Sequence, residues 1–156
     1  MTTEDLIKAA AARCDRIIAG FDDLRPILTP VLPIIGDDPS QLPLIERIAS
    51  IALLKRYEQL QDMLGRLFRA YLTWELEDVR AMTRRDQANQ LEKLGIVEDA
   101  DDWIGAAELR NRLVHEYPID EAEQVDRVND TWAASSGLIQ AYVTLRARLA
   151  EQGLIP

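Results

Sequence analysis

Residues 110–117 read Arg-Asn-Arg-Leu-Val-His-Glu-Tyr and contain the only histidine of this 156-residue chain. Plotted as a helix at about 100° per residue, the sequence from Trp103 to Tyr117 has one apolar arc, and Arg110 lies near the middle of it. The arc comprises Trp103, Ala106, Ala107, Leu109, Leu113, Val114 and Tyr117. An unpaired buried guanidinium costs several kcal/mol, so we expect Arg110 to have a partner or to open into a cleft.

The arginine and the histidine of this stretch each have a structural explanation as well as a chemical one. The stem of Arg110 could cover apolar surface while its charged head stays in water. His115 lies at the border of the same face, where a lone histidine is usually a hydrogen-bonded structural residue. Imidazole as a group also gains and loses a proton near neutral pH, which suits acid–base chemistry. Spacing alone leaves both explanations open.

The rest of the sequence favours helix nearly throughout, because Leu, Ala, Glu and Arg are abundant while Gly and Pro are few. Helical spacing of apolar residues predicts helices over residues 3–20, 21–32, 41–77, 83–96, 99–117 and 121–152, with a loop over 35–40. In the long 41–77 helix, the apolar stripe begins at Ile45, Ile48 and Ile51.

Local signals predict where these helices begin and end. Thr3 is expected to cap the first helix, and Thr83 with Asp86 resembles a capping box at the start of the fourth. Gly95 and Pro118 are the expected stops. The sequence therefore predicts an all-α fold, an up-and-down bundle of four to five main helices. Residues 1–156 are expected to form one domain, with 1–40 as an N-terminal helical extension and 41–152 as the core.

Composition and charge limit the classes of function. The single cysteine, Cys14, excludes an internal disulfide framework. No apolar run approaches the length of a membrane span, and the first residues do not resemble a signal peptide, so a cytoplasmic protein is expected. No glycine-rich phosphate loop is present, and one histidine and one cysteine are too few for a zinc site. The acidic runs are not arranged as paired metal carboxylates, so neither a metal nor a cofactor is expected.

The chemistry that remains is metal-independent cleavage of RNA. The 2′-hydroxyl is the nucleophile, so cleavage needs a base, an acid for the leaving oxygen and positive charge at the phosphate. His115 suits the proton transfers, and Arg110 suits the phosphate because its planar fork donates two hydrogen bonds. Asn111 lies one helical turn from His115 and could orient it. One helix supplies only one such histidine and one such arginine, whereas two copies about a twofold axis would supply two of each.

The pattern Arg110-Asn111-x-x-x-His115-x-Tyr117 resembles the R-x4-H-x-Y signature of HEPN domains in their HepT-like form. The short capped helix before Gly95 and the acidic start at Asp99 also resemble HepT-like toxins and the related nucleotidyltransferase substrate-binding HEPN proteins, over about residues 45–149. The resemblance implies a metal-independent endoribonuclease, the toxin of a toxin–antitoxin pair, with its cleft at a homodimer interface. It also implies a minimal nucleotidyltransferase antitoxin as partner, which attaches AMP at Tyr117.

Two hypotheses follow. In the first, the chain is this ribonuclease, with Arg110, His115 and Asn111 as catalytic residues and Tyr117 as the modified residue. In the second, it is a non-catalytic HEPN dimer that binds or scaffolds a nucleotidyltransferase. Tyr117 taken alone has a structural alternative, a core tyrosine whose hydroxyl reaches the surface. The net charge of −9 opposes a general RNA-binding surface, so positive charge must gather locally. The RNA-binding candidates are Arg112, Arg84 and Arg85. Positive charge could also gather at Lys55, Arg56, Arg66 and Arg69.

Overall fold

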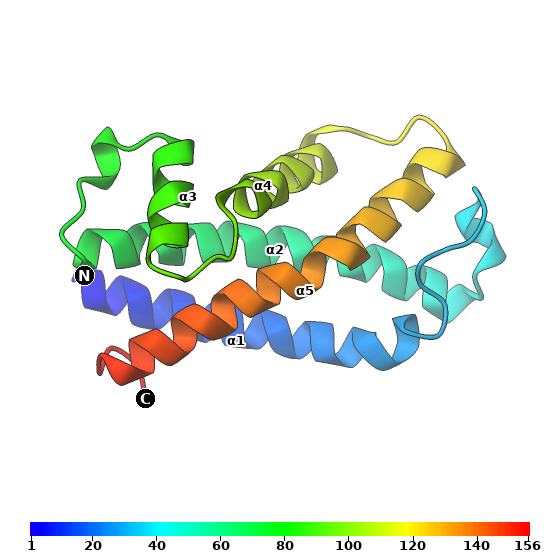
Figure 1. The fold of residues 1–156 in the computed structure, drawn as a ribbon. Helices are drawn as coiled ribbons and strands as arrows, with labels where there is room; N and C mark the ends of the chain where they lie inside the picture. Colours follow the sequence, from blue (N-terminus) through cyan, green and yellow to red (C-terminus); the bar gives the residue numbers. More distant parts are fainter.

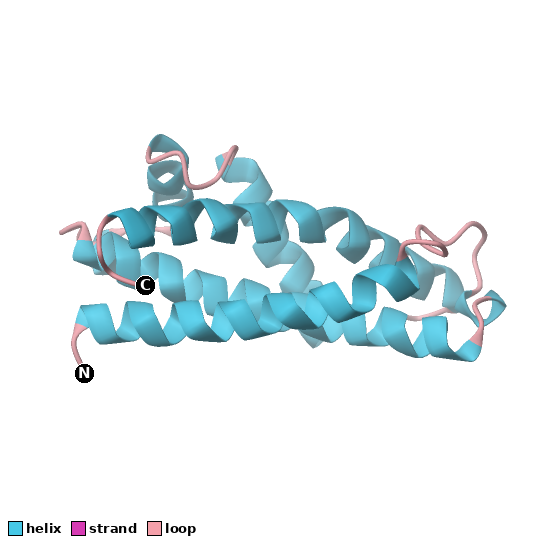
Figure 2. Ribbon diagram, turned by 90° about the horizontal axis from the view of Figure 1, so that it is seen from below, coloured by secondary structure: helices cyan, strands magenta, loops and turns pink.

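The structure, a computed structural model that describes all 156 residues, is built from helices and loops alone (Figure 1). Three long helices run along the molecule, α4 lies across them and the short α3 stands at one end; both termini lie at the same end (Figures 1 and 2). The predicted all-α bundle is confirmed. The α-helices are α1 (Thr3–Leu28), α2 (Leu44–Trp74), α3 (Arg84–Lys93), α4 (Ala100–His115) and α5 (Glu121–Glu151), and the 3₁₀ helices are η1 (Pro39–Gln41) and η2 (Val79–Ala81).

Two of the helices begin with a capping box. The predicted box at α3 is confirmed: the Asp86 backbone N–H donates to Thr83 Oγ1, and the Thr83 N–H donates to the Asp86 carboxylate. At α1 the cap is Thr2 rather than Thr3, with Asp5 completing the box. The backbone hydrogen bonds lower the pKa of Asp5 and Asp86, because they favour the charged carboxylate.

The first helix is longer than the sequence suggested. The predicted break at Gly20 was wrong, since α1 continues through Gly20 and Pro26 to Leu28. The Arg56 side chain of α2 lies against this glycine: a Cβ at Gly20 would lie 2.6 Å from Nε of Arg56, and the arginine would have to move. Gly20 is therefore a position of close approach between α1 and α2, and these two helices share the most extensive contact in the molecule.

One hydrophobic core of 33 buried residues unites the helices, including residues of α1 such as Ile7, Cys14 and Phe21. Two of its fully buried tyrosines place their hydroxyls on backbone carbonyls. Tyr57 Oη donates to the Ala106 carbonyl at 3.1 Å, and Tyr142 Oη lies 2.9 Å from the Ala11 carbonyl. Burial raises the pKa of both tyrosines, so the hydroxyls stay protonated donors at neutral pH.

The apolar stripe of α2 does not stay in the core along its whole length. Leu44, Ile45, Ile48 and Ile51 are 63%, 67%, 61% and 52% exposed. We call these four residues the isoleucine face. The core side of this part of α2 is formed instead by residues such as Ala49 and Leu53. Helical spacing marks which residues share a face, but whether another helix covers that face depends on distant segments. No helix of the chain is both long enough and apolar enough to cross a membrane.

Candidate functional site

Helix α4 carries the motif, and three contacts fix how it lies on α2. The Trp103 ring packs edge-on against Phe68 at a centroid distance of 4.7 Å and an interplanar angle of 67°. The Trp103 ring also lies against Gly65, where a Cβ would be 3.8 Å from the ring, an ordinary van der Waals distance. Further along, the Tyr57 hydroxyl donates to the Ala106 carbonyl. These contacts fix the rotation of α4, so that the face containing Arg110 turns toward Asp62 of α2.

The expectation that Arg110 has a partner is confirmed. Its Nη2 lies 3.8 Å from Oδ1 of Asp62 on α2, and its Nη1 donates to Oδ1 of Asn111 at 3.3 Å. The side chain is 29% exposed, and Nε is buried without a hydrogen-bond partner. Asp62 is 41% exposed and also approaches Arg66 at 3.3 Å. Because both ion pairs are long and open to water, the Arg110 guanidinium keeps donors available for an incoming anion.

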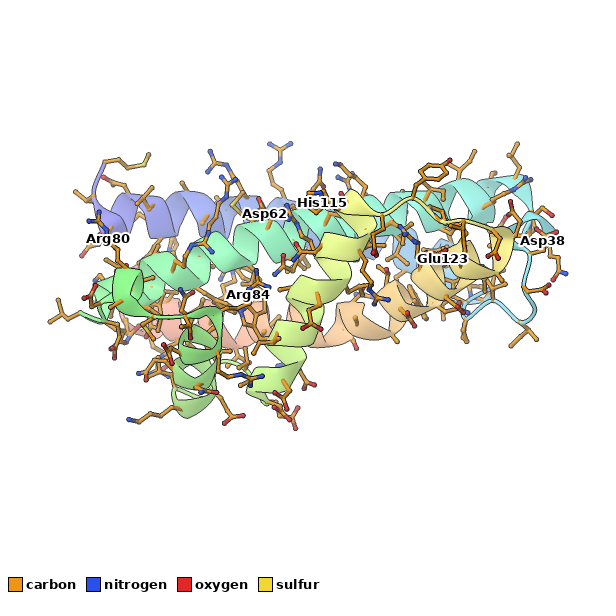
Figure 3. The ribbon with its side chains drawn as sticks, turned by 90° about the horizontal axis from the view of Figure 1, so that it is seen from above. Asp38, Asp62, Arg80, Arg84, His115 and Glu123 are labelled. Atoms are coloured by element: carbon orange, nitrogen blue, oxygen red, sulfur yellow. The ribbon has the colours of Figure 1, made fainter.

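His115 is the last residue of α4, and its side chain is exposed. Figure 3 shows it at the end of α4 that crosses α2, on the same side as Asp62. The polar contact of Asn111 is with Arg110, where the sequence suggested contact with His115. The structure therefore gathers Arg110, Asn111 and Asp62 into one polar cluster, with His115 just beyond it on the last turn of the helix.

A buried arginine that the sequence interpretation missed holds this last turn. Arg127 of α5 is 8% exposed, and its Nη1 donates to the Arg112 carbonyl at 3.4 Å. Its Nη2 lies 3.5 Å from Glu123 Oε1, while Glu123 Oε2 accepts from the Ile119 N–H at 2.9 Å. One network thus joins the end of α4, the connection after it and the start of α5. The signal was present, because Arg127 lies among the buried valines of α5, as Arg110 does among the apolar residues of α4.

Tyr117 does not lie where the helical plot placed it. The expectation that it shares the side of Arg110, two turns further along α4, was wrong. The helix ends at His115, and Glu116 has extended backbone angles of φ −114° and ψ 125°. Proline disfavours helical angles in the residue before it, so the chain leaves the helix ahead of Pro118. Tyr117 is 92% exposed, and its hydroxyl is accessible to a modifying enzyme. Val114, also assigned to the apolar arc, is 42% exposed.

The three basic candidates are divided between two places. Arg112 is exposed on α4, close to the cluster in sequence. Arg84 and Arg85 lie in the first turn of α3, and Arg85 Nη1 pairs with Asp101 Oδ1 at 2.7 Å. Asp101 is in the first turn of α4, and fourteen residues of helix place it about 21 Å from His115. Figure 3 shows Arg84 beside α3, away from the end of α4 that carries His115.

A pocket lies away from this cluster. It measures about 790 Å³ and lies between the first half of α4 and the middle of α5, lined by Trp103, Gly105 and Gly137 among others. No group of three or more His, Cys, Asp or Glu side chains is placed to hold a metal ion. Comparisons with protein-family models, with curated proteins and with solved structures found no match for this chain.

Proposed function

We propose that this chain is a metal-independent endoribonuclease of the HEPN type, with an active site completed by a second copy of itself. One observation carries the proposal: a guanidinium on the packed face of α4 stays open to solvent, and the only histidine lies on the last turn of the same helix. A purely structural arginine would be expected to have closer partners than 3.8 Å and 3.3 Å.

The reaction uses the 2′-hydroxyl of the RNA as its nucleophile. A base removes the 2′-hydroxyl proton, the oxygen attacks the adjacent phosphorus, and the bond to the 5′-oxygen breaks as an acid protonates that oxygen. The products are a 2′,3′-cyclic phosphate and a free 5′-hydroxyl. His115 is proposed for proton transfer and Arg110 for the phosphate oxygens, with Asn111 holding one edge of the guanidinium. A twofold pair of chains supplies one histidine as base and the other as acid.

Regulation is proposed at Tyr117. A minimal nucleotidyltransferase partner would let the tyrosine oxygen attack the α-phosphorus of ATP. Pyrophosphate would leave, the hydroxyl proton would be lost, and AMP would remain on the tyrosine. The 92% exposure of Tyr117 supports access by such a partner. The chain would then be the toxin of a cytoplasmic toxin–antitoxin pair, inactive while it carries AMP.

A second candidate function is a non-catalytic dimer that scaffolds a nucleotidyltransferase. The charge of the chain favours it, because the net charge is −9 and two surface arginines, Arg66 and Arg85, already pair with carboxylates. An RNA-binding surface is normally richer in free cations.

RNA cleavage by purified variants separates the two functions. His115→Ala and Arg110→Ala should each lower cleavage about 10²–10⁴-fold, the usual cost of a missing proton-transfer or charge-stabilising group. Arg80→Ala is the matched control, since Arg80 is an exposed arginine at the opposite end of α2 from the isoleucine face (Figure 3). Chelator should have no effect. Equal cleavage by wild type and His115→Ala, or no cleavage by wild type, would favour the scaffold.

A further inference from the structure

The outward surface of α2 has the spacing of a helix-pairing seam. Its residues recur at intervals of four and three, the repeat by which one helix packs against another in a coiled coil. The other sides of α2 are occupied by α1, α4 and α5. The seam starts on the isoleucine face and ends beside the candidate site. From its start to the site it consists of Leu44, Ile48, Ile51, Lys55, Glu58 and Asp62.

The first part of this seam is an apolar patch of the size that often has a function on a monomer. The four side chains of the isoleucine face together expose on the order of 500 Å², within the roughly 300–600 Å² of the largest apolar patch on a typical monomer. Such patches commonly mark interfaces. Two copies would cover about 1,000 Å² with these residues alone, and a specific interface begins at around 1,200 Å². The charged part of the seam must then be covered as well.

We propose that a second copy of this chain packs its α2 antiparallel against this seam. The order of charges identifies the occupant. Lys55 and Asp62 have opposite signs and lie on either side of Glu58. Lys55 Nζ lies 3.6 Å from Glu58 Oε2 of its own chain, so each glutamate near the axis has a lysine beside it. When two copies run antiparallel about a twofold axis near Glu58, each Lys55 faces the Asp62 of the other copy, and the match occurs twice. In a parallel pair, each lysine would face a lysine.

The isoleucine face is covered in the same arrangement. Residues at equal distances on either side of the axis face one another. Ile51 therefore lies opposite Arg66 of the second copy, and Ile48 lies opposite its Arg69. Both arginines are exposed, and their aliphatic stems can lie over the isoleucines while the guanidinium groups reach water. The contact extends along the 31 residues of α2, about 45 Å.

The same twofold axis brings the two copies of the candidate site close together. Asp62, the carboxylate that approaches Arg110, lies one helical turn from the axis, so the two copies of the Arg110 cluster come to lie beside one another. This step rests on the proposed function, since it supplies the second histidine that the reaction needs. The pairing of the α2 helices does not depend on that function, and assembly can be measured without RNA.

The first test is the mass of the protein in solution. Light scattering at about 50 µM should give twice 17.7 kDa for wild type, and 17.7 kDa for the double variant Ile48→Lys, Ile51→Lys, which sets lysines against Arg69 and Arg66 of the second copy. Circular dichroism should show unchanged helix content, because both side chains are exposed in the single chain. Val143→Lys is the matched control: Val143 is 48% exposed on α5, and the mass of this variant should stay that of wild type. A monomeric wild type, or a double variant as dimeric as wild type, would overturn the proposal.

Cross-linking tests the register, and the buried Cys14 leaves an introduced cysteine as the only reactive thiol. A short thiol cross-linker should join two copies of Glu58→Cys, which meet near the axis. It should not join two copies of Leu44→Cys, which would lie about 43 Å apart on antiparallel helices. Cross-linking of Leu44→Cys in place of Glu58→Cys would contradict the antiparallel arrangement. A dimer without RNA cleavage would contradict the proposed function and leave this interface standing.

Discussion

Replacing Arg127 with methionine should loosen the end of α4 at a moderate cost in stability. Methionine retains much of the buried stem but loses the donors to the Arg112 carbonyl and to Glu123, at 3.4 Å and 3.5 Å. Charged hydrogen bonds contribute about 1.5–3 kcal/mol at good geometry. These two are long, the Glu123 side chain is 37% exposed, and the Arg112 carbonyl still accepts from the Glu116 N–H at 3.0 Å. We therefore expect a loss of about 1 kcal/mol, a fall in Tm of roughly 2–4 °C.

The only histidine of the chain reports directly on whether the last turn of α4 loosens in Arg127→Met. The imidazole signals in an NMR spectrum belong to His115 without assignment, so their linewidths and shifts report on the last turn of α4. In Arg127→Met these signals should move toward those of a mobile side chain, and RNA cleavage should fall through kcat.

Arg148→Met is the matched control for this experiment. Arg148 donates to Tyr71 Oη at 2.8 Å and to the Leu94 carbonyl at 2.7 Å, both remote from His115. The control should lose more stability, because its bonds are shorter, but it should leave the His115 signals unchanged. If Arg148→Met altered the His115 signals as much as Arg127→Met did, the assignment of Arg127 as a positioning residue would be refuted.

Three further predictions follow from single positions. Burial raises the pKa of Cys14 from 9.0 to about 12. Between these two pH values the unfolded chain releases the thiol proton while the folded protein keeps it. The free energy of unfolding should therefore fall by up to about 1.4 kcal/mol per pH unit as the pH rises from 9 toward 12. Urea melts across this range should show that component in wild type and not in Cys14→Ala. Trp103→Ala should cost about 3–5 kcal/mol in the same melts, because it empties the contact with Phe68 and Gly65; a loss below 1 kcal/mol would mean that α4 is held by other contacts. Tyr117→Phe should keep RNA cleavage, and a co-expressed nucleotidyltransferase should not inactivate it. Intact-mass spectrometry of wild type inactivated by the same partner should show added AMP. An unmodified mass would leave occlusion by the partner as the means of neutralisation.

Much of the site could be anticipated from sequence, because its main signal is local. A charge among apolar residues at helical spacing marks a side chain that must find a partner, and Arg110 has one in Asp62. The identity of that partner was beyond local reasoning, since it lies 48 positions earlier in the chain. Arg127 shows the same signal among the buried residues of α5, but its contacts with Arg112 and Glu123 form only once α4 and α5 have packed together. Tyr117 was misplaced because the helical plot was extended across the effect of Pro118 on the residue before it.

By itself, the sequence determined the helical class, the capping box at Thr83 and the Gly95 stop, since these depend on residues three or four positions apart. Only the tertiary structure decided that α1 runs through Gly20, because a glycine in a sequence fits both a break and a continuous helix packed against another, and here the Arg56 side chain of α2 lies against it. It likewise decided that the isoleucine face stays uncovered. Periodicity shows that one side of a helix is apolar, but burial requires another segment to lie over it, and in the first half of α2 the chain has none on that side.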